Sequence, residues 1–174
     1  MNDFTQLIFF ISPAILVAVS AYVVLHKMIK NDEARRNFEI QKSTRQATTP
    51  IRLQAYERFI LLLERISPDS LVVRTHQNGM SCQDLHLALL AVVREEFEHN
   101  LSQQLYISID AWATIKAAKE SIVMHINESA AKTNAENSAI ELARLIVESH
   151  VGEGKSNLIL SAKDLLKNEA KKIF

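Results

Sequence analysis

The segment from Glu96 to His99 reads Glu-Phe-Glu-His, a spacing that could support metal chemistry. On a helix, a Glu-x-x-His pair places a carboxylate and an imidazole on the same side, as in the ligand pairs of carboxylate-bridged di-iron sites. Such a site needs a second Glu-x-x-His pair and further carboxylates from two other helices. No other histidine of the chain follows an acid at this spacing. Glu96 and His99 therefore form half a metal site, which a second copy of the helix in a homodimer would have to complete.

A structural role fits the same segment. If residues 82–106 form one helix, its core-facing arc consists of Leu90, Val93, Phe97, Leu101 and Leu105. A polar shoulder borders this arc and contains Glu96, His99, Asn100, Gln103 and Gln104. Where these side chains are buried, a neighbouring helix or a partner chain must supply their hydrogen-bond partners. Within the chain, Arg58 or Arg65 could be that partner. The sequence thus predicts either a polar network for packing or interaction, or a metal-binding enzyme or sensor.

Other chemical motifs are incomplete. The stretch from Gly152 to Ser156 (Gly-Glu-Gly-Lys-Ser) resembles a phosphate loop, but Ser149 replaces the first glycine and a helix precedes the stretch instead of a strand. A glycine helix stop followed by a serine cap explains it. Because no Ser-His-Asp or Cys-His set is evident either, we predict no catalytic residue, no cofactor and no small-molecule substrate.

The composition points to a helical protein without an overall electrostatic function. Glycine and proline number only 3 each, which favours long helices with short connections. The 20 basic residues balance the 20 acidic ones, so no net charge attracts nucleic acid. The single cysteine, Cys82, has no partner within the chain for a disulfide, and we interpret it as structural.

An uncharged segment runs from Phe4 to Leu25. As a helix it would extend about 33 Å, enough to cross a hydrocarbon core of about 30 Å. Four basic residues follow it and indicate a cytoplasmic carboxy-terminal part with the amino terminus outside: Lys27, Lys30, Arg35 and Arg36. We therefore expect a membrane anchor whose basic flank sets the topology or touches anionic lipid. A cleaved signal peptide or a buried core helix are the alternatives.

The remainder is predicted to form an antiparallel helical bundle. After the anchor (residues 1–26), residues 27–49 are expected to form a polar stalk, either as a continuation of the anchor helix or as a disordered linker. Pro50 starts the bundle, which extends over residues 50–174. Helices are expected at about 50–66, 82–106 and 108–132, with a short helical turn after Ser67-Pro68. Capping boxes at Ser81 and Asp84 and at Thr133 and Glu136 predict the starts of two helices, and Ser108 and Ser156 are expected to cap two others.

Three stretches carry a family resemblance. They are Leu53-Gln-Ala-Tyr-Glu-Arg58, Arg65-Ile-Ser-Pro68 and the segment from Arg94 to Tyr106, with Trp112 after it. With these stretches the chain resembles a conserved family of membrane-anchored helical proteins from Bacteroidota that has no established activity. The resemblance implies an inner-membrane setting and brings no catalytic residues. Together with the residues, it predicts a non-enzymatic bundle that binds another protein or a second copy of itself.

Overall fold

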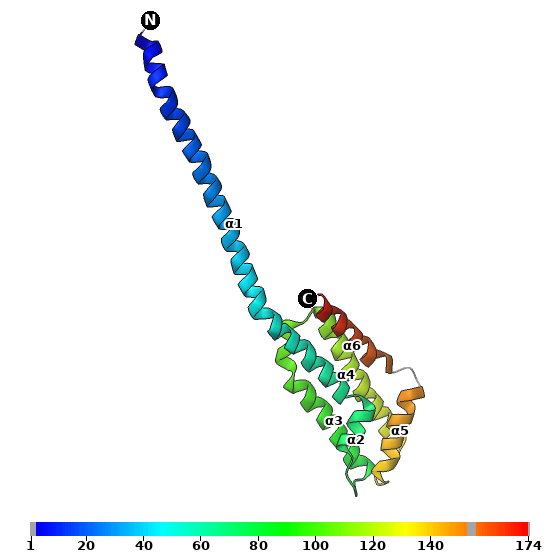
Figure 1. Ribbon diagram of the computed structural model, residues 1–174. Coiled ribbons are helices and arrows are strands. Elements are labelled where there is room, and N and C mark those ends of the chain that lie inside the picture. The colour runs from blue at the N-terminus through cyan, green and yellow to red at the C-terminus, as the bar shows by residue number, and fades with distance from the viewer. Residues whose placement is uncertain (1–2, 153–155, 174) are drawn as a thin grey trace. The chain divides into compact units, whose positions relative to one another are not determined.

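The computed structural model describes the backbone of residues 3–152 and 156–173, and the side chains of residues 15–33, 35–149 and 158–173. Over these residues the chain is helical and contains no strand, as the sequence predicts for an all-α protein. By contacts it divides into two compact units, Met1–Thr48 and Thr49–Phe174. Figure 1 shows the helices in chain order.

The first helix, α1, spans Asp3–Arg65 and belongs to both units. Our prediction that a new helix begins at Pro50 is wrong, because α1 continues through this residue. Proline has no N–H, so the carbonyl of Gln46 loses its helical donor there, while the helix is maintained on both sides of Pro50.

The structure gives one finding on the predicted membrane span. Within the described residues, no helix has a stretch that is both long and apolar enough to cross a bilayer. The predicted span, Phe4 to Leu25, includes residues 4–14, whose side chains lie outside the described ones.

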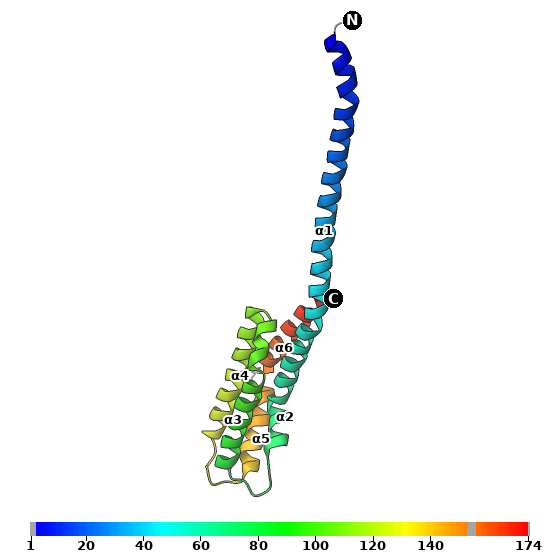
Figure 2. The ribbon, with the colours of Figure 1, turned by 90° about the vertical axis from the view of Figure 1, so that its left-hand side faces the viewer.

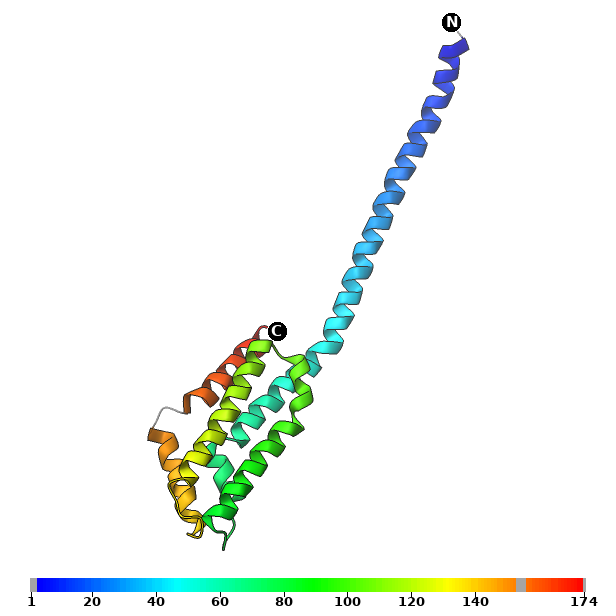
Figure 3. The same ribbon diagram turned by 180° about the vertical axis from the view of Figure 1, so that it is seen from behind.

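The second unit combines the end of α1 with six shorter helical elements. They are α2 (Pro68–Thr75), α3 (Cys82–His99), the 3-10 helix η1 (Leu101–Tyr106), α4 (Ile109–Ala130), α5 (Ala139–Gly152) and α6 (Ser156–Lys171). The carboxy-terminal part of α1 runs antiparallel to α3, and α4 runs antiparallel to α3, α5 and α6 (Figure 2). η1 and the end of α6 lie at one end of this bundle, whereas the loops that precede α3 and α5 lie at the opposite end (Figure 3).

One hydrophobic core joins these helices. Its largest fully buried side chains come from α1, α2, α3, α4, α5 and α6, and they include Phe59, Leu63, Leu71, Leu89, Ile115, Ile146 and Leu166. Trp112 lies at the border of the core, where its ring is 5.8 Å from that of Phe59 and 5.2 Å from that of Phe97. The Phe97 ring stacks on Trp112 and the Phe59 ring is tilted against it, so the three rings connect α1, α3 and α4.

Two of the predicted helix starts have the expected caps. The Ser81 hydroxyl accepts a hydrogen bond from the Asp84 N–H, and the Asp84 carboxylate accepts one from the Ser81 N–H, both at 3.1 Å. The Ser81 hydroxyl also donates to the Asp84 carboxylate at 2.7 Å, and this bond, together with the weaker effect of the Ser81 N–H, holds the pKa of Asp84 below its usual value. Ser108 caps α4 by accepting from the Ala111 N–H at 3.0 Å.

The other two predicted caps have different outcomes. The capping box predicted at Thr133 and Glu136 is wrong, because α5 begins at Ala139 and the Thr133 hydroxyl donates back to the Ala130 carbonyl. The first residue of α6 is Ser156, and its side chain lies outside the described residues.

Candidate functional site

Glu96 lies on the last turn of α3, and its carboxylate is shared by two arginines. Arg65 at the end of α1 donates to one oxygen at 3.3 Å, and Arg74 on α2 donates to the other at 3.4 Å. Arg74 also donates to the Arg65 carbonyl at 3.2 Å. The Glu96 side chain is only 15% exposed, so this ion-pair cluster joins three helices in a partly desolvated position.

The remaining residues of the predicted polar shoulder are divided between two elements. His99 is the last residue of α3 and is exposed, while the buried Asn100 caps this helix. The Asn100 amide donates to the Glu96 carbonyl at 2.9 Å, which satisfies one of the free carbonyls at the helix end. Gln103 and Gln104 are half-buried on η1. The prediction that one helix extends to Tyr106 is therefore wrong.

The early end of α3 also changes the predicted core face. Val93 is fully buried, and Leu90 and Phe97 pack against the core. Leu101 is 41% exposed and Leu105 is 81% exposed, although both belong to the predicted arc. The reason is that residues 101–106 form a 3-10 helix, which has 3.0 residues per turn. The spacing that would place Leu101 and Leu105 on the core side of an α-helix therefore points them away from the core.

A groove lies between the second-unit part of α1 and the end of α3. Its lining consists of Gln54, Glu57, Arg58, Leu61, Leu62, Arg65, Glu96, His99 and Asn100. The groove thus brings Glu96, His99 and Asn100 together with Arg58 and Arg65, the two arginines that the sequence offered as intramolecular partners. Leu61 is 59% exposed beside the half-buried Arg58. An exposed apolar side chain and a half-buried arginine therefore lie on the same stretch of helix.

The geometry around Glu96 bears on metal binding. Among the described residues, no group of three or more histidine, cysteine, aspartate or glutamate side chains is placed to hold a metal ion. A metal ion at Glu96 would have to displace two guanidinium groups from its carboxylate. The arrangement within one chain therefore favours an ion-pair cluster at this position.

Sequence reasoning missed a second polar cluster, centred on Glu169 of α6. The Glu169 carboxylate accepts from the Tyr56 hydroxyl of α1 at 3.0 Å and from the Ser108 hydroxyl. Burial of the phenol raises the pKa of Tyr56 above its usual value of 10.0, the bond to Glu169 raises it further, and Arg52 opposes this with a smaller effect. No periodic pattern in the sequence joins three residues so far apart, although a buried tyrosine usually requires a polar partner.

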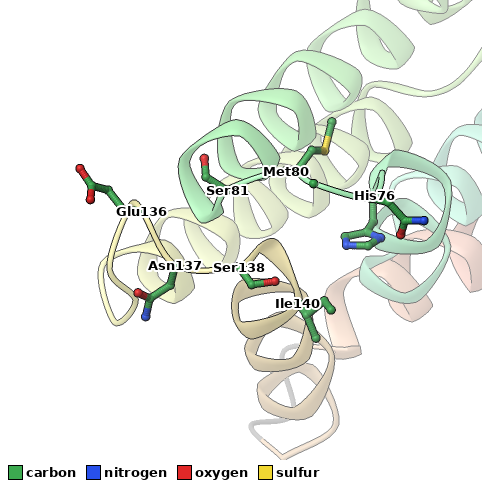
Figure 4. Close-up of a pocket in the computed structure, with 9 residues that line it drawn as sticks. His76, Met80, Ser81, Glu136, Asn137, Ser138 and Ile140 are labelled. Carbon is green, nitrogen blue, oxygen red and sulfur yellow. The ribbon is translucent and has the colours of Figure 1, made fainter.

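A second pocket lies between the loops that precede α3 and α5. Figure 4 shows Ser81 and Ser138 where these loops meet, with His76, Met80, Asn137 and Ile140 around them. The two loops are joined through their backbones: Cys82 N–H donates to the Asn137 carbonyl at 2.8 Å, and Ala139 N–H donates to the Met80 carbonyl at 3.1 Å. The buried Cys82 thiol contacts the Ser138 carbonyl at 3.3 Å. These contacts fix the starts of α3 and α5 and give Cys82 a structural position.

The basic residues that follow the predicted span lie on α1 in the first unit. Lys27, Lys30, Arg35 and Arg36 are exposed, and Arg35 pairs with Glu39 at 3.0 Å. At the other end of the chain, the phosphate-loop-like stretch from Gly152 to Ser156 includes residues 153–155, which lie outside the described residues.

Comparison with known proteins identifies a family. No curated protein and no solved structure matches the chain. The model of DUF7935, a family of unknown function, matches residues 2–173. This match extends over the first unit as well as the second, including the groove and the Glu169 cluster. The chain therefore belongs to the DUF7935 family of unknown function.

Proposed function

We propose that the protein is a non-enzymatic helical bundle that a single amino-terminal span tethers to the cytoplasmic face of a bacterial inner membrane, where the bundle recruits another protein. The observation that carries this proposal is the uncharged segment from Phe4 to Leu25 with the basic residues Lys27, Lys30, Arg35 and Arg36 after it. The resemblance to membrane-anchored proteins of Bacteroidota supports the bacterial setting.

The charge asymmetry around the segment supports the proposed orientation. Asp3 is the only charged side chain before Phe4, whereas Lys27 and Lys30 follow Leu25 within one and a half turns of helix. Segments rich in lysine and arginine remain on the cytoplasmic side. The bundle, which follows these residues, then lies in the cytoplasm.

The polar clusters of the bundle support a non-enzymatic role. Among the described residues, Glu96 and Glu169 are the partly buried acids that would be candidates for acid–base chemistry, and each accepts from two donors on neighbouring segments. A carboxylate held in this way stabilises the contact between helices and is less accessible to a substrate. The exposed Leu61 and the groove beside it support recruitment of a protein.

Fractionation of cells tests the anchor. We compare the full chain with a variant that lacks residues 4–25, both produced at low level in a Gram-negative bacterium. We expect the full chain in the membrane pellet, resistant to alkaline carbonate and released by detergent, and the shortened variant in the supernatant. Release of the full chain by carbonate would contradict the proposal, since carbonate removes peripheral proteins and leaves spanning helices in the bilayer.

A further inference from the structure

A hollow on α1 in the first unit brings two lysines together at the end of the uncharged segment. Its lining consists of Val24, Lys27, Met28, Lys30 and Asn31. Intervals of three and four residues connect these side chains, so they share one face of the helix, and all of them are exposed. The hollow therefore offers two ammonium groups and an amide beside two apolar side chains.

The charge of this hollow is positive, because its lining contains no acid. The two acids that follow in the sequence, Asp32 and Glu33, both fall more than about 90° from the middle of the face at about 100° per residue. Within the described part of the chain, neither lysine of the hollow forms an ion pair, whereas Arg35 pairs with Glu39 at 3.0 Å. A negatively charged group that enters the hollow thus meets two unneutralised ammonium groups.

The two lysines lie at the depth of lipid phosphates if the uncharged segment spans the bilayer. Leu25 is then the last residue in the hydrocarbon core. A helix rises about 1.5 Å per residue, so Lys27 and Lys30 lie about 3 Å and about 8 Å beyond Leu25. The head-group region on each side of a bilayer is about 5 to 8 Å thick. Arg35 and Arg36 lie at least about 15 Å beyond Leu25 and therefore outside this region.

Two rings on the other side of α1 fit the same depth. Tyr22 stacks on His26, with ring centroids 5.9 Å apart and an angle of 11° between the ring planes. Tyrosine is enriched where hydrocarbon meets the head groups, because its ring is apolar and its hydroxyl is polar. The stacked rings and the two lysines therefore surround the helix where the proposed span ends.

We propose that the hollow binds an anionic phospholipid, with the phosphate between Lys27, Lys30 and Asn31 and an acyl chain against Val24 and Met28. This inference rests on the proposed anchor and names the lipid class that the anchor selects. Lysine stems lie along apolar surface while their ammonium groups reach the head groups, and anionic head groups attract them. A zwitterionic head group carries an ammonium group of its own, which the two lysines repel.

Native mass spectrometry of the full chain tests the inference. The protein is purified in detergent and mixed with equal amounts of phosphatidylglycerol and phosphatidylethanolamine, and the bound lipids are identified and counted. We expect a clear preference for phosphatidylglycerol. A lysine near an anionic surface contributes about a fivefold preference, so Lys27→Gln combined with Lys30→Gln should reduce it by more than about tenfold.

Arg35→Gln combined with Arg36→Gln is the matched control, because it removes the same charge from the same helix outside the hollow. It should leave the lipid preference within about twofold, and circular dichroism checks that both double variants are folded. Equal retention of the two lipids, or an equal loss in both double variants, would overturn the inference. So would displacement of the lipid by inorganic phosphate, since a site for a free anion needs no acyl chain.

The lipid measurement is independent of membrane topology. A detergent micelle has no inner or outer side, so the effect of the lysines on orientation does not enter the result. Carbonate extraction tests the span, and the lipid preference tests the hollow. The anchor and the lipid site can therefore fail separately.

Discussion

At the scale of single residues, the contacts of Glu96 show what the Glu-x-x-His pair does in the folded chain. The sequence places a carboxylate and an imidazole on one side of a helix, and it names Arg65 as a possible partner. The second arginine, Arg74, lies on a helix eight residues long that packs near the end of α1, and no spacing rule connects it to Glu96. Tertiary contacts of this kind depend on how the loops position short helices, which the residues alone do not determine.

Replacing Glu96 tests the ion-pair cluster. Glu96→Gln keeps the shape of the side chain but leaves Arg65 and Arg74 without their shared carboxylate. We expect the free energy of unfolding to fall by about 1 kcal/mol, since the pairs are only partly shielded from water. Glu98→Gln is the control, because Glu98 is exposed on the same turn. Urea unfolding followed by circular dichroism measures both variants, and equal losses would contradict the cluster.

The raised pKa of Tyr56 predicts a pH dependence of stability. A folded-state pKa above the unfolded value of 10.0 means that the neutral phenol is favoured in the folded protein. Its contribution is complete below pH 10 and is lost as the pH rises through the folded-state pKa. The free energy of unfolding should therefore fall more steeply above pH 10 in the original chain than in Tyr56→Phe. Parallel curves for the two proteins would show that this tyrosine is not responsible.

The helices themselves show what can be predicted from sequence at the level of elements. The starts of α3 and α4 follow from Ser81 and Ser108, because a serine before an apolar run caps a helix through local hydrogen bonds. The end of α3 does not follow, because the leucine spacing continues to Leu105. The helix ends at Asn100, whose side-chain amide donates to the Glu96 carbonyl. This local hydrogen bond replaces a backbone bond of the helix, and the spacing of apolar residues gives no indication of it.

Two substitutions distinguish the cap that forms from the one that does not. Ser81→Ala removes the acceptor of the Asp84 N–H and should lower the free energy of unfolding by about 1 kcal/mol. Thr133→Ala should cost less than half as much, since the Thr133 hydroxyl bonds only to the Ala130 carbonyl. Thermal or urea unfolding of the two variants measures the difference. The reverse order would mean that α5 is capped at Thr133 after all.

At the scale of the whole molecule, two features lead to the proposed role. The bundle has a single core with contributions from α1 to α6, and its partly buried acids hold helices together. The uncharged segment and its basic flank precede the bundle in the sequence. In the proposed role, this stable body with its open groove is tethered by the proposed span and holds a partner near the bilayer.

The location of Phe174 tests this account most directly. Two fusions at the carboxy terminus are compared in the same bacterium, one with a fluorescent protein that matures only in the cytoplasm and one with a phosphatase that is active only in the periplasm. We predict a fluorescent membrane fraction from the first fusion and no phosphatase activity from the second. An active phosphatase without fluorescence would place the bundle outside the cytoplasm and contradict the proposed role.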